Sequence, residues 1–193
     1  MIDAPVVFST DANNRIVAIR AQPAYDHRVW SDDSLEPVRC EVRDHYRRAQ
    51  RLRCVYCLNL LSVRSAVGAP VEHIAPKSMY LGYMFEPLNL CVCCPDCNEY
   101  KSNREVLTDP PIKGYVPVAY PNDPAKFRIV HPHLDEYSTH IRRAGILYIP
   151  LSEKGSYTFY VCNLARYLGE FGVTDDLFND LNAVMQRHQF HSG

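Results

Sequence analysis

The sequence Cys54-Val55-Tyr56-Cys57, matched further along the chain by Cys94-Pro95-Asp96-Cys97, decides the fold. Each C-x-x-C pair brings two thiolates together, and two such pairs supply the four ligands, at about 2.3 Å, that a tetrahedral zinc ion requires. A zinc ion bound in this way contributes on the order of 10 kcal/mol to the folding of a short segment. We therefore expect a structural zinc site around which the rest of the chain is arranged, with the ligands Cys54, Cys57, Cys94 and Cys97.

The later pair has a second register, because Cys91-Val92-Cys93-Cys94 is also a C-x-x-C sequence. Pro95 suits the first turn of a helix, where its missing N–H costs no hydrogen bond, and Asp96 is favourable at the positive end of that helix. A helix that starts within the pair suits the second knuckle of a zinc site. We therefore predict Cys94 and Cys97 as ligands, and expect the remaining cysteines to be free thiols: Cys40, Cys91, Cys93 and Cys162.

The composition is that of an ordinary folded protein of 193 residues, with 47% hydrophobic and 22% charged residues. The formal net charge of -1 does not by itself indicate a polyanion partner, so any nucleic-acid surface must be a local patch. Residues 1–20 show no basic region followed by an apolar run, so we expect no signal peptide, and no apolar run is long enough to span a membrane. We expect a soluble, cytoplasmic chain whose eight cysteines are reduced; in a secreted chain they would instead indicate disulfides.

A helix is predicted over residues 36–50, where Pro37 suits the first turn and apolar residues recur at helical spacing. A basic stripe lies beside the apolar one: Arg39, Arg43, Arg47 and Arg51. Such a stripe is often only a solvated face. Its place just before the zinc-binding stretch also suits contact with a phosphate backbone, since arginine forks match phosphate oxygens. Both interpretations stay open here, and Arg43, Arg47 and Arg51 are our candidates for nucleic-acid binding.

Between the two cysteine pairs we predict a hairpin, a loop and a helix. The apolar run 58–63 and the run 71–74 are expected to pair, with a turn at Gly68-Ala69-Pro70. Residues 77–93 are expected to form a loop, followed by one or two helical turns from Pro95. Upstream, the run 15–19 has the composition of a strand.

The same stretch carries Glu72-His73-Ile74-Ala75-Pro76, Asn89-Leu90 and Cys97-Asn98, with Lys101 one helical turn later. Together with the cysteine pairs these residues resemble the HNH endonuclease family, over residues 54–104. The resemblance implies a ββα-metal core with a four-cysteine zinc site, and hydrolysis of phosphodiester bonds with one divalent cation. By this resemblance His73 is the general base that activates water, Glu72 and Asn98 hold the catalytic ion, and Asn89 orients the histidine loop.

The chemistry also follows from the residue types. Hydrolysis of a phosphodiester needs a base, a cation and groups that position both. Histidine is largely neutral at cellular pH and can accept a proton from water. Asn98 stands where the family often has histidine, and its amide oxygen favours Mg²⁺ over softer ions such as Mn²⁺. Glu72 and His73 serve one site only if the strand ends or twists there, which Pro76 favours. Lys101 shares the helix face of Asn98 and is a candidate phosphate contact.

We divide the chain into an N-terminal extension with the arginine-rich helix (1–53), the nuclease core (54–104) and a C-terminal extension packed on the core (105–193), in a single α+β domain with helical and hairpin extensions. In the last segment, a proline-rich connection precedes a cluster that is either a second metal site or the anchor of a helix: His131, His133, Asp135, Glu136 and His140. We expect a hairpin of 146–151 with 157–161, a helix over 163–170, and a last amphipathic helix from Thr174.

The expected function is a metal-dependent endonuclease with structural Zn²⁺ and catalytic Mg²⁺ or Mn²⁺, acting on nucleic acid, with DNA favoured over RNA. Residues 128–140 also resemble the extension of bacterial HNH proteins found with anti-phage defence systems, which implies a defence role. The modest charge suggests a regulatory or targeting protein partner. The alternative is a zinc-bearing module that binds nucleic acid or protein without catalysis, because two cysteine pairs alone are also found in non-catalytic zinc ribbons.

Overall fold

The computed structural model describes residues 2–110 and 119–172, which form a mixed α+β structure of short elements. Two separate antiparallel pairs of strands are present in this part of the chain. The elements are α1 (Thr10–Arg20), η1 (His27–Ser31), η2 (Asp33–Leu35), α2 (Glu36–Ala49), β1 (Val71–His73), η3 (Leu81–Tyr83), η4 (Pro87–Asn89), β2 (Leu90–Val92), α3 (Pro95–Lys101), η5 (Pro124–Lys126), α4 (Tyr137–His140), β3 (Ile141–Ala144), β4 (Leu147–Pro150), α5 (Glu153–Val161) and α6 (Arg166–Phe171).

The central unit is β1, β2 and α3. β1 pairs antiparallel with β2, so that Glu72 lies opposite Cys91 and His73 opposite Leu90. The predicted pairing of 71–74 with 58–63 is therefore wrong, and so is the loop predicted over the whole of 77–93. The reason is burial: all three residues of β2 are inaccessible to solvent, whereas Leu60 is 73% exposed and only bridges back to Arg53. β1 therefore pairs with the segment that is buried in the core, 90–92, and not with the exposed run 58–63.

Helix α2 packs on this pair of strands, and its predicted bounds of 36–50 are confirmed to within one residue. Val38, Val42 and Tyr46 are fully buried along its inner face. Just beyond the helix, the Gln50 side chain binds the edge of β2: its amide donates to the Val92 carbonyl at 2.7 Å and accepts from the Val92 N–H at 2.9 Å. One side chain thus replaces the backbone partner that the edge of β2 lacks.

The N-terminal segment forms helix α1, so the strand predicted over 15–19 is wrong. The Ser9 hydroxyl caps this helix by accepting from the Ala12 N–H, and Ala12, Ile16 and Ile19 are buried at helical spacing. The cap is itself held by Glu41 of α2, which accepts from the Ser9 N–H and hydroxyl, each at 2.7 Å. Residues 15–19 are therefore helical because Glu41 of α2 holds the N-terminal cap of α1 in place.

In the C-terminal segment, β4 lies within the predicted strand 146–151, but its partner is β3 and not 157–161. Residues 153–161 are helical because Ser152 caps α5, accepting from the Gly155 N–H at 3.1 Å. The helix predicted over 163–170 is observed as α6, which ends before Gly172. The helix predicted from Thr174 lies outside the described residues.

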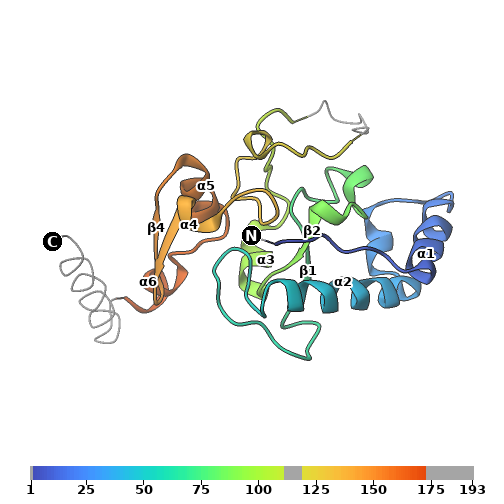
Figure 1. Ribbon diagram of the computed structural model, residues 1–193, viewed down its shortest axis with the longest axis horizontal. Coiled ribbons are helices and arrows are strands. Elements are labelled where there is room, and N and C mark those ends of the chain that lie inside the picture. The colour runs from blue at the N-terminus through green and yellow to red at the C-terminus, as the bar shows by residue number, and fades with distance from the viewer. Residues whose placement is uncertain (1, 111–118, 173–193) are drawn as a thin grey trace.

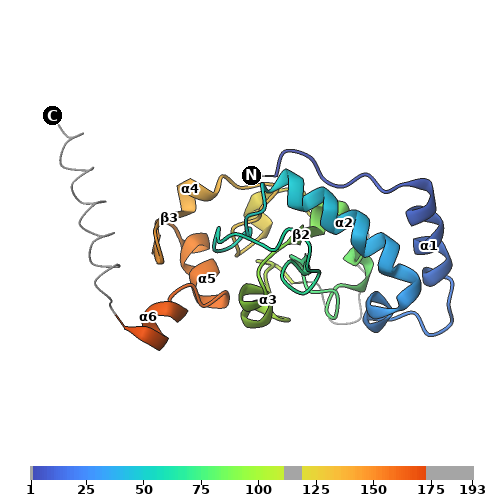
Figure 2. The same ribbon diagram turned by 90° about the horizontal axis from the view of Figure 1, so that it is seen from below.

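Figures 1 and 2 show how the elements are arranged. α1 and the first half of α2 lie at one end of the molecule, α4, α5 and α6 lie at the other, and β1, β2 and α3 lie between them. One cluster of buried side chains includes residues from all three predicted segments, among them Ile16, Tyr46, Leu90, Ile141 and Leu164. Within the described ranges, no helix has both the length and the apolar character needed to cross a membrane.

Candidate functional site

The four predicted zinc ligands come together. The sulfur atoms of Cys54, Cys57, Cys94 and Cys97 all lie within 4.8 Å of one another and all four residues are buried. Four ligands at about 2.3 Å from a tetrahedral ion would be roughly 3.8 Å apart, so this cluster can hold a metal ion such as zinc. Cys94 also caps α3, since its sulfur accepts from the Cys97 N–H.

The alternative register is not the one observed. Cys91 lies within β2 and Cys93 directly after it; both are fully buried and stand outside the four-cysteine cluster. Burial raises the pKa of both thiols well above its ordinary value, so they remain neutral. The helix that starts at Pro95 selects Cys94 and Cys97 instead.

Arg166 of α6 lies against the cluster and was not predicted. Its guanidinium is within 3.7 Å of the Cys97 sulfur and 3.8 Å of the Cys94 sulfur, and it pairs with Asp96 at 3.3 Å. A site of four thiolates and one Zn²⁺ carries two negative charges, which a neighbouring buried cation stabilises. No local sequence pattern marks Arg166, because it reaches the site from another part of the chain.

Three of the four residues assigned to catalysis or to the catalytic ion line one pocket of about 590 Å³. Glu72, His73 and Asn98 all face it, the first two from β1 and the third from α3. β1 ends at His73. Adjacent residues within a strand point to opposite faces, so the strand must end here for Glu72 and His73 to face the same site. Trp30 also lines the pocket and meets the His73 ring edge-on, with centroids 4.5 Å apart.

The His73 ring is buried and held in one tautomer. Its Nε2 lies 3.0 Å from the Met84 carbonyl oxygen, which can only accept a hydrogen bond. Nε2 therefore carries the proton in the neutral ring, and Nδ1 keeps its lone pair. Burial lowers the pKa of His73 well below its ordinary value, and the nearby Lys77 lowers it further. The ring is consequently neutral at pH 7, as a general base must be before it acts.

Asn89 is fully buried and holds the loop that follows β1. Its side-chain oxygen accepts from the Ala75 N–H at 2.7 Å, and its amide donates to the carbonyls of Ala75 and Tyr83, each at 3.0 Å. These three bonds connect both ends of the loop that contains Met84, the partner of His73. Asn89 does not line the pocket, so it acts on the path of this loop and not on a bound molecule.

Lys101 is placed differently from our prediction. It is fully buried, its ammonium lies 2.5 Å from Glu72 Oε1, and it also donates to the His73 carbonyl at 3.0 Å. The Tyr56 hydroxyl, from within the first cysteine pair, donates to the same Glu72 oxygen at 3.3 Å. The prediction that Lys101 contacts phosphate is thus wrong: it has no exposed surface, and it fixes the Glu72 carboxylate instead.

The arginine stripe of α2 is also largely internal. Arg43 is 5% exposed and pairs with Glu36 at 3.0 Å, and Arg47 is 9% exposed and donates to the Ser65 carbonyl at 2.7 Å. Their predicted role in phosphate contact is corrected by this burial, because neither guanidinium is presented to a ligand. Arg51, which follows the helix, is the predicted member that is exposed.

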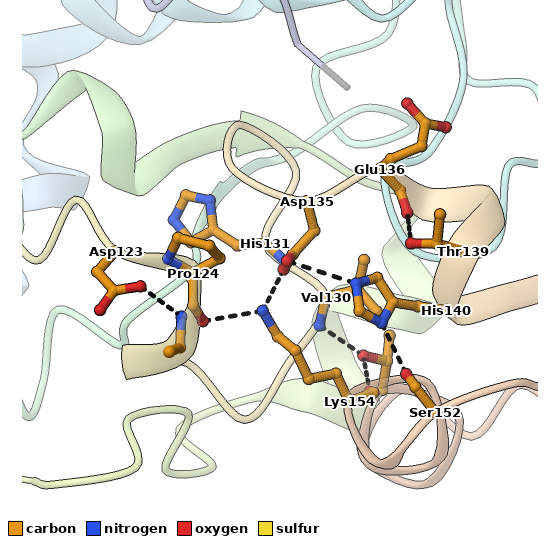
Figure 3. Close-up of polar contacts among 12 residues, drawn as sticks. Asp123, Pro124, Val130, His131, Asp135, Glu136, Thr139, His140, Ser152 and Lys154 are labelled. Carbon is orange, nitrogen blue, oxygen red and sulfur yellow. Dashed lines mark hydrogen bonds and ion pairs between the residues drawn. The ribbon is translucent and has the colours of Figure 1, made fainter.

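The histidine and acid cluster of the C-terminal segment is an anchor (Figure 3). Asp135 accepts from the His131 N–H at 2.7 Å, lies 3.4 Å from His140 Nε2 and pairs with Lys154 of α5. His140 Nδ1 lies 2.6 Å from the Ser152 hydroxyl. In the part of the chain that the structure describes, only the four cysteines form a group spaced for a metal ion. Of our two interpretations, anchoring of the α4 and α5 region is the one observed.

Lys77 and Trp30 are among the pocket residues that the sequence did not lead us to expect. Lys77 lines the pocket directly after Pro76, and Trp30 reaches it from η1. Lys77 adjoins the Glu-His motif and was discoverable from that position, whereas Trp30 carries no local signal. No family model matches this chain, and no curated protein matches it.

Proposed function

We propose that this protein is a metal-dependent endonuclease and that β1, β2 and α3, with the four-cysteine cluster, form an HNH-type core. The observation that carries the proposal is the pocket in which Glu72, His73 and Asn98 meet. A neutral imidazole, a carboxylate and an amide oxygen in one pocket match the needs of phosphodiester hydrolysis: a base, and hard ligands for a cation.

His73 has the role of the base. With Nε2–H donated to the Met84 carbonyl, Nδ1 is the nitrogen that accepts a proton from water. The imidazolium that results keeps its bond to Met84, which stabilises the developing charge. The T-shaped contact with Trp30 restricts rotation of the ring, while the bond to Met84 sets the tautomer, so both are fixed before substrate arrives.

Glu72 and Asn98 are the residues that would hold the catalytic cation. Glu72 Oε1 is already engaged by Lys101 and Tyr56, which leaves Oε2 for a ligand bond. One carboxylate oxygen and one amide oxygen suit Mg²⁺, which commonly keeps several waters and takes further oxygens from substrate phosphate. When bound, the ion would neutralise charge on the scissile phosphate and the leaving oxygen. The pairing with Lys101 lowers the net negative charge at Glu72, so we expect the isolated protein to bind Mg²⁺ weakly.

The four-cysteine cluster serves this site through Tyr56. Tyr56 lies between two of the cysteines and bonds to Glu72, so the knuckle geometry sets the position of a residue in the pocket. We assign the metal of this cluster a structural role, since four thiolates leave no open position for a substrate.

The test is cleavage of plasmid DNA and of a structured RNA by the full chain, with Mg²⁺ present or omitted. We expect cleavage that requires Mg²⁺ and falls by about 100-fold or more in His73→Ala, because a general base contributes on that order. His45→Ala, which alters a histidine outside the pocket, is the matched control and is expected to cut normally. Unchanged cutting by His73→Ala would refute the base assignment. Absence of cutting by the wild type on both substrates would favour the zinc-bearing binding module.

A further inference from the structure

A phosphodiester in this pocket needs a positively charged side chain beside it, since the group is an anion and gains charge as it is hydrolysed. The cations predicted from sequence do not supply one: Arg43 and Arg47 are buried on α2, and Lys101 is committed to Glu72. Arg51 is exposed but does not line the pocket. Lys77 is the only lysine or arginine among the described residues that line the pocket.

Lys77 differs from Lys101 in what its ammonium contacts. Lys101 has no exposed surface and lies 2.5 Å from the Glu72 carboxylate. Lys77 is half-buried, and it makes no ion pair within the described part of the chain. Burial lowers the pKa of Lys77, and Lys101 lowers it further, while Glu72 opposes this change. A partly desolvated cation that is not in an ion pair gains more than an exposed one when an anion arrives, because water screens it less.

The backbone at Lys77 is held in place before any ligand binds. Asn89 bonds to both the N–H and the carbonyl of Ala75, and the Pro76 carbonyl accepts from the N–H groups of Met79 and Tyr80, each at 2.9 Å. Lys77 therefore begins a fixed turn at the edge of the pocket. This leaves only the side chain to be ordered on binding, which limits the entropy lost.

We propose that Lys77 is the phosphate-contacting residue of this site: its ammonium binds a non-bridging oxygen of the scissile phosphodiester while His73 faces the attacking water. This inference rests on the proposed function and names the residue that recognises the substrate's charge. Lys77 transfers no proton in this role. It holds the phosphate beside Glu72 and Asn98 and neutralises the charge that develops on the phosphate oxygens.

The experiment compares wild type, Lys77→Gln and Lys77→Arg with Lys126→Gln, whose lysine is 54% exposed and pairs with Asp109 away from the pocket. Cleavage of plasmid DNA and of RNA is measured with Mg²⁺. Binding of a labelled 20-base-pair DNA and a 20-nucleotide RNA is measured by fluorescence anisotropy without Mg²⁺, over a range of salt concentrations. Zinc content and melting temperature confirm that each variant is folded.

We expect Lys77→Gln to slow cleavage by about 100- to 1,000-fold, as loss of one preorganised donor does. The slope of log affinity against log salt should become shallower by about 0.9 on duplex DNA or about 0.7 on single strands, the value of one phosphate contact. Lys77→Arg should recover part of the cleavage rate and part of the salt dependence, and Lys126→Gln should match wild type in both measurements. If wild type fails to cut but the slope still changes in Lys77→Gln, the nuclease proposal fails and the phosphate contact stands. If Lys77→Gln matches Lys126→Gln in both assays, or wild type neither cuts nor binds, the inference is overturned.

Discussion

The buried pair of Lys101 and Glu72 allows the sharpest test of the structure. The Lys101 side chain is 0% exposed and that of Glu72 is 6% exposed, with 2.5 Å between the charged atoms. Lys101→Met keeps most of the apolar volume of the side chain but leaves the Glu72 carboxylate buried, held at Oε1 only by the Tyr56 hydroxyl. Removing one partner of such a pair typically costs about 3–5 kcal/mol, because the remaining charge is buried without compensation.

The assay is urea unfolding at a fixed free zinc concentration, since metal bound to the folded state adds to the apparent stability. With a urea dependence of about 2 kcal/mol per M, this loss lowers the unfolding midpoint by about 1.5–2.5 M. Lys126→Met is the matched control: Lys126 and Asp109 form an ion pair at 3.3 Å in which the two side chains are 54% and 82% exposed. An exposed pair contributes about 1 kcal/mol or less, so the midpoint should shift by about 0.5 M at most.

A double variant completes the test. Glu72→Gln removes the charge that Lys101→Met leaves behind, so the combined variant should be more stable than Lys101→Met alone. A midpoint for Lys101→Met no lower than that of Lys126→Met would show that Lys101 is not the buried partner of Glu72. That result would also remove our reason for excluding Lys101 from phosphate contact.

Three more predictions follow from single contacts. Gly155→Ala should destabilise the C-terminal region severely, because the added Cβ would lie 1.9 Å from a backbone oxygen at the end of α4. In Gly169→Ala the added Cβ meets nothing within 4 Å, so this variant should stabilise α6 by up to about 1 kcal/mol. Thermal unfolding should show a lower melting temperature for the first variant and an equal or higher one for the second. Cys57→Ser should abolish stoichiometric zinc binding, measured by atomic absorption, and weaken the far-ultraviolet circular dichroism signal. Cys40→Ser changes an exposed thiol outside the cluster and should retain one zinc per chain. Equal zinc content in both variants would contradict the four-thiolate site. Burial lowers the pKa of His131 to about 2, below the value of about 6.5 expected in the unfolded chain. The unfolded chain therefore binds more protons, and the free energy of unfolding should fall as pH drops below about 6.5, by up to about 1.4 kcal/mol per pH unit. His131→Gln should make that decline shallower between pH 6.5 and 5 in denaturant titrations, and an unchanged slope would contradict the buried neutral imidazole.

Much of the candidate site could be predicted from local sequence. The spacing within each cysteine pair identified all four members of the cluster, and the helix expected after Pro95 chose between two registers. The 36–50 helix was recognised because an apolar stripe at helical spacing needs no knowledge of its partner. The adjacency of Glu72 and His73 near the end of a strand was also legible, because Pro76 marks that end.

What the sequence alone determined, then, are features set by spacing along the chain: which cysteines converge, which helix starts where, and which polar residues lie between them. The tertiary structure decided which segments pair and which charges are buried. Three-residue strands such as β1 carry too little pattern to name a partner, so the pairing with β2 depends on what the core covers. Whether a lysine is exposed to a ligand or pairs with a buried carboxylate likewise depends on neighbours far away in sequence. Lys101 pairs with Glu72 in the interior, whereas Lys77 lines the pocket.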